Sequence, residues 1–394
     1  MSAAARTAAP GRAATGRGSA LVAMVGAGQL ARMTHQAATA LGVELRVLAG
    51  GVDDAAVRAG AQHLMGSPDR LADLRALAAG ADVLTFDHAR VAPDLLAVLE
   101  ADGVRLAPSA GAKLLAQDKL HARRELAALG FPVPPFTHTH TPKGATDFAR
   151  AHGWPLVAKA SRGGYDGRGV FVLADERAAL RALAAHPAGL LLEPRLELER
   201  ELAVLIARST SGGDRVAYPA AETVQRDGMC REVLAPAPIP PSLAAQARDL
   251  AFSLADAIGA TGVLAVELFH TREGRLLVNE LALRPHNSGH YTIEGCVTSQ
   301  FEQHLRAVLG WPLGLPTLRA PAVASINVIG PTDGGDPATR IASALEVPGA
   351  HVHLYGKEPR AGRKLGHVTV CGEDMKAARH AASLAATLLE GAAP

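Results

Sequence analysis

The chain has 394 residues, 48% hydrophobic and 20% charged, which is ordinary for a globular protein with room for two or three domains. Its formal net charge of +2 argues against nucleic-acid binding driven by phosphate neutralisation, and no apolar run approaches the ~18 residues of a membrane span. Three widely separated cysteines without a CxxC pair predict free thiols in a reducing compartment, so we expect a cytoplasmic protein whose partners are neither membranes nor nucleic acids.

Residues 1–20 are rich in Ala, Gly and Arg and contain no acidic residue. They lack the apolar core of a secretory signal, so we expect a disordered tail, with a transit peptide as the alternative.

The next segment predicts a βαβ opening, with a strand at 21–25, a glycine turn at 26–28, a helix at 29–41 and a strand at 43–48. A strand at 81–88 and a helix at 93–103 extend this first domain to about residue 110. The loop GAGQL at 26–30 can present backbone amides to a phosphate. Because Ala31 replaces the third glycine of a dinucleotide fingerprint and no acid ends the second strand, we expect a phosphate or ribose phosphate rather than NAD. A simple tight turn is the alternative.

The middle of the chain begins with a predicted helix at 113–130 and an extended linker at 131–136. A strand at 154–160 carries Lys159 and runs into the glycine-dense stretch SRGGYDGRG, 161–169. Such a loop can close backbone N–H groups over phosphates, although it is not a Walker A loop because the lysine precedes the glycines. A plain hairpin turn is the alternative. Beyond it we expect an extended segment at 193–208 and a helix at 242–259.

Two carboxylates are predicted to face each other on neighbouring strands. The runs GVLAVELF (262–269) and LLVNELA (276–282) flank TREGR, and a two-residue turn centred on Glu273–Gly274 places Glu267 opposite Glu280. Like charges in facing positions repel, so a bridging cation is expected, and a small set of oxygen ligands suits Mg²⁺ completed by substrate phosphates. A coincidental solvent-exposed pair is the alternative.

A basic, amide-rich loop follows directly in NELALRPHNSGH, 279–290. Arg284 offers a fork of donors to carboxylate, bicarbonate or phosphate, and Asn287 can hydrogen-bond an oxyanion. The loop is therefore predicted to hold a small anion beside a transferred phosphate. His286 and His290 near a glutamate leave zinc as an alternative, and a solvated loop is another.

The C-terminal part, beyond a boundary at 316–320, is expected to be small and rich in strands. Its stretch YGKEPRAGRKLGHV gathers Lys357, Arg360, Arg363 and Lys364 on a glycine-containing loop. Such a cluster suits a phosphomonoester, and a charged surface loop is the alternative.

From residue 22 onward the chain resembles the N5-carboxyaminoimidazole ribonucleotide synthases, an ATP-grasp family of bacterial purine biosynthesis. The resemblance rests on VGAGQLARM, SRGGYDGRG, VELF…VNE, RPHNSGHYTIEGCVTSQFEQHLRAVLG and YGKEPRAGRKLGHV in this order. It implies an α/β (α+β) ATP-grasp fold with a Rossmann-like domain at 21–110, an ATP-grasp domain at 111–315 with its lid at about 133–195, and a small strand-rich domain at 316–394. It also implies a homodimeric carbon–nitrogen ligase that uses ATP and Mg²⁺ to join bicarbonate, through carboxyphosphate, to 5-aminoimidazole ribonucleotide.

The resemblance also implies roles for individual residues. Glu267 and Glu280 would bind the metal. The residues placed at the reacting groups are Arg284, Asn287, Tyr165 and Asp166. Those placed at ATP are Lys119, Lys159, Gly164, Tyr165, Asp166, Gly167, Arg168, Gly169, Val170, Glu193, Pro194, Arg195, Leu196, Glu201, Gln225, Asn279 and Glu280. Those placed at the ribonucleotide are Gln29, Leu30, Lys357, Arg363 and Lys364.

The chain departs from the family pattern at Ala31, Lys119, Gln225 and Leu283, and in the segment FDHARV, where Ala89 and Arg90 replace an expected acid and histidine. Ala89 removes a contact to the ribonucleotide that the family pattern would supply. Rival readings are another ATP-grasp ligase, such as a formate-dependent purine transformylase or a biotin carboxylase, and a silent nucleotide-binding homologue. The first should lack RPHNSGH followed by TSQFEQH, and the second should lack Glu267 or Glu280.

Overall fold

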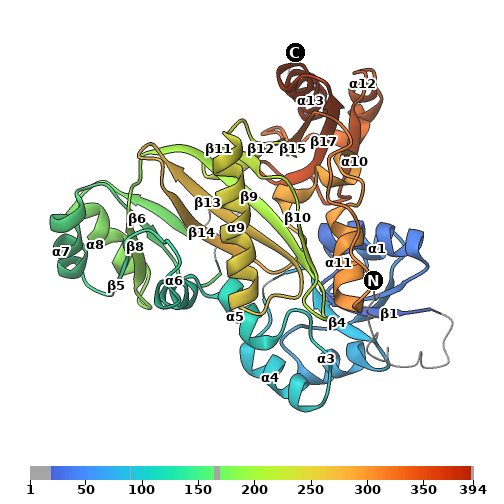
Figure 1. Cartoon of the computed structure of the whole chain (residues 1–394), viewed down its shortest axis with the longest axis horizontal. Coiled ribbons are helices and arrows are strands. Elements are labelled where there is room, and N and C mark those ends of the chain that lie inside the picture. Colours follow the sequence, from blue (N-terminus) through green and yellow to red (C-terminus); the bar gives the residue numbers. More distant parts are fainter. Residues whose placement is uncertain (1–18, 89, 164–168, 392–394) are drawn as a thin grey trace, which may run out of the picture.

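The computed structural model of the protein describes residues 19–88, 90–163 and 169–391. The chain folds into an N-terminal region, a lid that projects to one side, a long central sheet and a C-terminal region above it (Figure 1). The predicted phosphate loop residues 164–168 and Ala89 lie outside the described residues. None of the helices within the described ranges is long and apolar enough to cross a membrane.

The N-terminal region is a parallel sheet in the order β3-β2-β1-β4 with helices on its faces. Both faces are covered, which is why β1 (Leu21–Val25) is an unbroken apolar run, buried throughout. Its other elements are β2 (Glu44–Ala49), β3 (Gln62–Met65), β4 (Val83–Phe86), α1 (Gln29–Leu41), α2 (Ala55–Arg58), α3 (Leu71–Ala78) and α4 (Pro93–Ala101). The predicted βαβ opening is confirmed, since β1 pairs with β2 in parallel and α1 connects them.

The single helix predicted at 113–130 is wrong. The segment forms α5 (Ala110–Gln117) and α6 (Lys119–Ala128), separated at Asp118. Asp118 has extended backbone angles, and its side chain accepts a hydrogen bond from the His121 N–H, so it caps the second helix. The break gives Lys119 the first position of α6 and aims that helix at the central sheet.

The lid is a small sheet in the order β5-β8-β6-β7, backed by two helices. Its elements are β5 (Thr137–Thr139), α7 (Pro142–His152), β6 (Leu156–Lys159), β7 (Val170–Leu173), α8 (Glu176–Ala185) and β8 (Leu190–Pro194). Leu156, Ala158 and Leu192 point into the lid's own core under the helices. Because side chains alternate along a strand, Lys159 and Glu193 occupy the opposite face.

The central sheet is antiparallel and runs in the order β14-β13-β9-β11-β12-β15-β17-β16, with β10 beside β9. Its strands from the middle of the chain are β9 (Leu198–Arg208), β10 (Arg215–Ala217), β11 (Ala221–Arg226), β12 (Met229–Ala235), β13 (Gly262–Thr271) and β14 (Leu276–Ala282). Helix α9 (Pro241–Ala257) packs Ala251 and Leu254 against Val204 and Leu264 of this sheet, forming the main core.

The C-terminal strands continue this sheet, because β15 pairs with β12. The region comprises β15 (Ala322–Ile329), α12 (Ile341–Leu345), β16 (His351–Leu354), β17 (Lys364–Gly372) and α13 (Met375–Glu390), with a short 3₁₀ turn η2 (Pro337–Arg340). Helix α13 covers β15 and β17. Between the regions lie η1 (Asn287–Gly289), α10 (Thr292–Gly295) and α11 (Gln300–Leu309). Helix α11 connects these regions to the N-terminal region, because its Leu305 and Val308 pack into the hydrophobic core under β1.

Candidate active site

Glu267 on β13 lies opposite Glu280 on β14, and the register predicted from the sequence is confirmed at this pair. The predicted two-residue turn at Glu273–Gly274 is wrong. His270 pairs with Leu276, and the Thr271 N–H donates to the Arg275 carbonyl at 3.0 Å, so three residues form the loop. A β-bulge with Asn279 as the extra residue then restores the predicted pairing.

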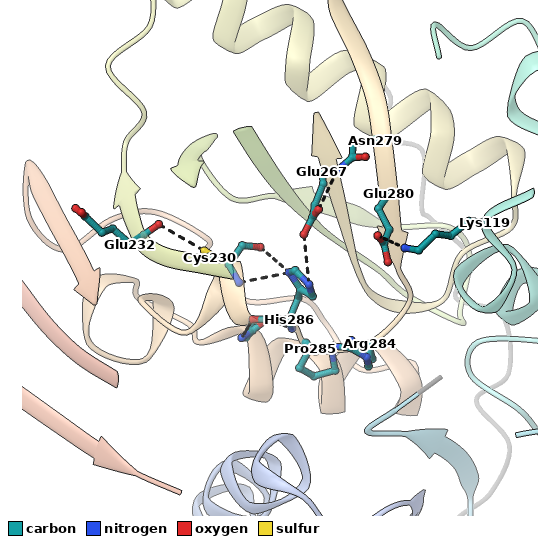
Figure 2. Close-up of polar contacts among 11 residues, drawn as sticks. Lys119, Cys230, Glu232, Glu267, Asn279, Glu280, Arg284, Pro285 and His286 are labelled. Atoms are coloured by element: carbon teal, nitrogen blue, oxygen red, sulfur yellow. Dashed lines mark hydrogen bonds and ion pairs between the residues drawn. The ribbon is translucent and has the colours of Figure 1, made fainter. Parts of the chain in front are cut away.

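The bulge brings Asn279 next to the carboxylate pair. Its amide nitrogen lies 3.4 Å from Glu267 Oε2, and its amide oxygen accepts a hydrogen bond from Lys159 Nζ at 3.1 Å. Figure 2 shows Glu267, Asn279 and Glu280 converging from the two strands, with Lys119 reaching Glu280 from α6. The arrangement gathers two carboxylates, an amide and two ammonium groups at one end of the central sheet.

The electrostatics of the pair favour a bound cation. Burial, together with the neighbouring charges of Glu280 and Glu201, raises the pKa of Glu267 to about 7 against the opposing charges of Lys119 and Lys364. A carboxyl group that is costly to ionise in the protein alone becomes favourable to ionise when a divalent cation lies beside it. Two facing carboxylates therefore fit Mg²⁺, which is usually held by one or two carboxylates plus substrate phosphates.

A buried ion network links the lid to this end of the sheet. Glu193 on β8 contacts Lys159 Nζ at 2.7 Å and Arg123 at 2.5 Å, and both partners are largely buried. Lys119, Arg123, Lys159, Asn279 and Glu280 line one small cavity. Sequence reasoning missed Arg123, although its position four residues after Lys119 on one helix face could have indicated it.

The loop after β14 is built around a buried glutamine. Gln300 at the start of α11 accepts from the His286 N–H at 2.8 Å and donates to the His286 carbonyl at 2.8 Å. His286 Nε2 in turn lies 3.6 Å from Glu267 Oε1 (Figure 2). Burial lowers the pKa of His286 well below its usual value, and the charges of Arg284 and Lys364 lower it further. His286 is thus a neutral imidazole beside the carboxylate pair. It was not among the site residues predicted from the sequence.

Two predicted anion ligands lie in the same loop. Arg284 Nη1 donates to the Pro285 carbonyl at 2.9 Å. Burial raises the pKa of Asp87 to about 6 although the charge of Arg284 opposes the rise, and burial together with the charge of Arg284 lowers the pKa of Lys113 to about 7. Arg284 therefore lies where the N-terminal region meets the central sheet. Both amide atoms of Asn287 are out of contact with solvent and have no hydrogen-bond partner among the described residues. An unpaired buried amide is unfavourable, which fits a side chain whose partner is a ligand.

The zinc alternative requires both histidines of the loop to turn toward one ion. His286 Nδ1 instead lies 2.9 Å from Ser288 Oγ, and His290 Nδ1 lies 3.1 Å from Gln300 Nε2. These two ring atoms serve hydrogen bonds within the loop rather than a shared metal.

The glycine loop of the N-terminal region has a carboxylate partner that sequence reasoning missed. Asp87, which follows β4, accepts a hydrogen bond from the Gly28 N–H at 2.7 Å. Gly26 has a φ of +102°, and a Cβ there would lie 1.9 Å from Asp87 Oδ1. The carboxyl ends of parallel strands meet at the same edge of the sheet, so an acid that follows the fourth strand can reach the glycine loop. An acid was expected only after the second strand, and Asp87 was therefore missed.

The glycine loop and the C-terminal basic cluster meet. Leu30 packs with Tyr355 in one apolar cluster, so any contact of Leu30 with a ligand comes from its main chain. Lys357 Nζ lies 3.3 Å from the Lys364 carbonyl, and Arg363 donates to the Glu358 carbonyl at 3.0 Å. A cavity of about 550 Å³ lies beside Lys357, and its lining also includes Asp53, Arg58, Asp336 and Glu358.

The remaining predicted nucleotide contacts lie along the lid and the facing sheet. Glu193 and Pro194 end β8, and Arg195 and Leu196 lead out of it. Glu201 on β9 is hydrogen-bonded to Gln225 on β11, and burial raises the pKa of Glu201. Val170 begins β7 and Gly169 directly precedes it, whereas Gly164, Tyr165, Asp166, Gly167 and Arg168 lie outside the described residues.

Comparisons with known proteins agree with this architecture. Residues 124–301 match the ATP-grasp domain family, residues 20–117 the ribonucleotide synthetase preATP-grasp domain, and residues 323–381 the phosphoribosylaminoimidazole carboxylase C-terminal domain. A clamp of two sheets over paired carboxylates and lysines is the site of an ATP-grasp enzyme, and that is the class to which the fold belongs.

Within that class the chain belongs to the N5-carboxyaminoimidazole ribonucleotide synthase family, whose members are ATP-dependent ligases. It is 52% identical to the synthase of Mycobacterium tuberculosis over 93% of this chain and 87% of that one. The Corynebacterium ammoniagenes synthase is 43% identical, with 95% and 92% covered. The structure of the Aspergillus clavatus synthase with ATP superimposes with a TM-score of 0.87 at 32% identity, covering 95% of this chain and 99% of that one. A further structure from that organism, described as a complex with ADP and 5-aminoimidazole ribonucleotide, gives a TM-score of 0.85 at 32% identity, again over 95% and 99%.

Proposed function

We propose that this chain carboxylates the amino group of 5-aminoimidazole ribonucleotide with bicarbonate and ATP, giving N5-carboxyaminoimidazole ribonucleotide, ADP and phosphate in de novo purine biosynthesis. The observation that carries the proposal is the pairing of Glu267 with Glu280 directly before the loop that holds Arg284, His286 and Asn287. Family membership supplies the identity of the substrates.

In the first step a bicarbonate oxygen attacks the γ-phosphorus of ATP, the bond to the β–γ bridging oxygen breaks, and ADP leaves. Lys119 and Lys159 neutralise phosphate oxygens from opposite sides of the cleft, one from α6 and one from the lid. Arg284 and Asn287 orient the bicarbonate beside the γ-phosphate. Phosphoryl transfer needs positioning and charge neutralisation more than covalent chemistry, and these residues provide both.

Glu267 and Glu280 are the residues that would hold Mg²⁺, with Asn279 beside them. When bound there, the ion would neutralise charge that develops on the transferred phosphate. His286, held neutral by burial and by two nearby cations, donates or accepts a hydrogen bond without adding charge to the site.

In the second step the amine nitrogen of the ribonucleotide attacks the carbonyl carbon of carboxyphosphate. The bond from that carbon to the phosphate oxygen breaks, phosphate leaves, and one proton passes from the nitrogen to the departing phosphate. Tyr165 and Asp166, in the loop over the phosphates, are proposed to contact the imidazole ribonucleotide.

The ribonucleotide phosphate is proposed to bind between Gln29–Leu30 and the cluster of Lys357, Arg363 and Lys364. These residues come from opposite ends of the chain, and the packing of Leu30 on Tyr355 supports their convergence. The adenine is proposed to lie along 193–196, and the ribose beside Glu201 and Gln225. The glycine loop from Gly164 to Val170 would cover the phosphates.

Three wider features are also proposed. The domains divide at about residues 110 and 315, with residues 1–20 as a tail. The working unit is a homodimer in the cytoplasm, as composition and the family resemblance indicate. Another ATP-grasp ligase would use the same carboxylate pair with a different acceptor and remains the second candidate function.

The test is release of ADP by the purified protein with Mg²⁺, ATP and bicarbonate, with and without 5-aminoimidazole ribonucleotide. We expect release to depend strongly on the ribonucleotide. Release that is indifferent to it would refute the proposed acceptor, and the Ala89 departure would then be the first position to examine.

A further inference from the structure

We propose that Arg123 is a positioning residue for ATP. By contacting Glu193 it links the lid to strand β14, and by sharing the charge of Glu193 it leaves Lys159 with positive charge that can attract the nucleotide phosphates. This inference rests on the proposed use of ATP and deepens it. Arg123 is placed in none of the ATP-contacting roles given above.

Arg123 joins three elements that the nucleotide must bridge. It lies on α6, its side chain is 3% exposed, and its guanidinium donates to the carbonyls of Val278 at 2.7 Å and Asn279 at 3.1 Å. The same group contacts Glu193 Oε1 at 2.5 Å. One side chain therefore connects a core helix, the edge strand of the central sheet and a strand of the lid.

One of the two carbonyls that Arg123 binds belongs to Asn279, the bulged residue, and the other to Val278 directly before it. A bulge removes a residue from the ladder and leaves backbone groups without their regular partners. Arg123 satisfies these carbonyls immediately before Glu280. It thus stabilises the local shift that brings Asn279 beside Glu267 and keeps Glu280 in register.

The charges around Glu193 are unequal. Arg123 and Lys159 both contact this one carboxylate, so the buried group carries a formal surplus of one positive charge. Burial raises the pKa of Glu193, but Lys159 and Arg123 more than offset that and hold the pKa below its usual value. Without Arg123, the single negative charge of Glu193 would be balanced by the Lys159 ammonium group only. That ammonium group would then attract a nucleotide phosphate less strongly.

The test compares binding and turnover in Arg123→Met, Arg123→Lys and Arg124→Met. Arg124 is the matched control, because it is the next residue on the same helix but is exposed. ATP affinity is measured calorimetrically with Mg²⁺ and without ribonucleotide. We expect Arg123→Met to weaken ATP binding at least about tenfold and to raise the KM for ATP while the KM for the ribonucleotide stays within about twofold. Arg123→Lys should recover part of the loss.

A second variant separates charge from packing. Arg123→Met combined with Glu193→Gln removes both partners and restores a single positive charge at Lys159, so it should bind ATP better than Arg123→Met alone. Thermal unfolding of each variant reports folding, and where Arg123→Met does not fold, Arg123→Lys and Arg123→Gln take its place.

Equal ATP affinity in Arg123→Met and Arg124→Met would overturn the proposal. So would an equal rise in both KM values, because that would indicate general loss of structure. The ATP-affinity measurement contains no ribonucleotide, so it tests the role of Arg123 even if ADP release does not depend on that substrate.

Discussion

Glu267 and Glu280 face each other across β13 and β14 only because the β-bulge at Asn279 offsets a turn that is one residue longer than the simplest hairpin. Without the bulge, the strand would shift by one residue and Glu280 would turn to the other face of the sheet. The carboxylate pair is therefore a product of register as much as of composition.

The first prediction concerns this pair. Glu280→Gln removes one of the two carboxylates without changing the shape of the side chain, so we expect turnover to fall by at least about a hundredfold with the fold intact. Steady-state ADP release and circular dichroism measure the two effects. Glu273→Gln, in the exposed loop of the same hairpin, is the control and should retain activity. Normal turnover in Glu280→Gln would show that the metal assignment is wrong.

A second prediction concerns the C-terminal cluster. Lys357→Ala should raise the KM for the ribonucleotide about tenfold or more and the KM for ATP much less, because the lysine lines a cavity of about 550 Å³ and belongs to the cluster proposed to bind the ribonucleotide phosphate. Initial rates with each substrate varied in turn provide the measurement. Arg360→Ala is the comparison, since that exposed arginine pairs with Glu358. Equal rises in both KM values would contradict the assignment of this cluster to the ribonucleotide phosphate.

A third prediction separates crowding from backbone strain in the glycine loop. Gly26→Ala places a methyl group against Asp87 at a φ of +102°, whereas Gly42→Ala introduces strain at a φ of +67° with nothing within 4 Å. We expect Gly42→Ala to cost about 1 kcal/mol of unfolding free energy and to leave kinetics unchanged. Gly26→Ala should cost more and also raise the KM for the ribonucleotide. Chemical denaturation and initial rates measure both, and an unchanged KM would separate this loop from the substrate.

A fourth prediction concerns acid stability. His304 is fully buried, with Nδ1 accepting from the Val263 N–H and Nε2 beside Thr85 Oγ1 at 2.8 Å, and burial lowers its pKa from 6.5 to about 3. The unfolded chain takes up a proton on this histidine below pH 6.5 and the folded chain does not until about pH 3, so the folded state loses stability as the pH falls through that window.

His304→Gln should therefore make the unfolding free energy less dependent on pH between 7 and 5, although it lowers stability at pH 7. Denaturant unfolding at several pH values measures the slope. His351→Gln changes an exposed histidine and should leave the slope as it is in the wild type. A slope that His304→Gln does not alter would contradict the assignment.

Local sequence predicted much of the architecture. The strand at 21–25, the helix at 29–41 and the opposing strands of Glu267 and Glu280 follow from hydrophobic periodicity and turn residues, and the structure confirms them. The helix predicted at 113–130 failed because periodicity does not register a side chain that caps a new helix, as Asp118 does. The predicted two-residue turn was wrong because a three-residue loop followed by a bulge gives the same pairing of Glu267 with Glu280 as a two-residue loop without a bulge.

The sequence by itself determined which elements form and which chemical groups the site contains, because those depend on short-range spacing. Only the tertiary structure decided that Arg123 shares Glu193 with Lys159, that Asp87 binds the glycine loop, and that Gln300 holds the His286 backbone. These partners are separated by 34 to 70 residues or, for His286 and Gln300, lie in different local elements. The packing of whole sheets and helices, rather than any local pattern, brings such groups within hydrogen-bonding distance.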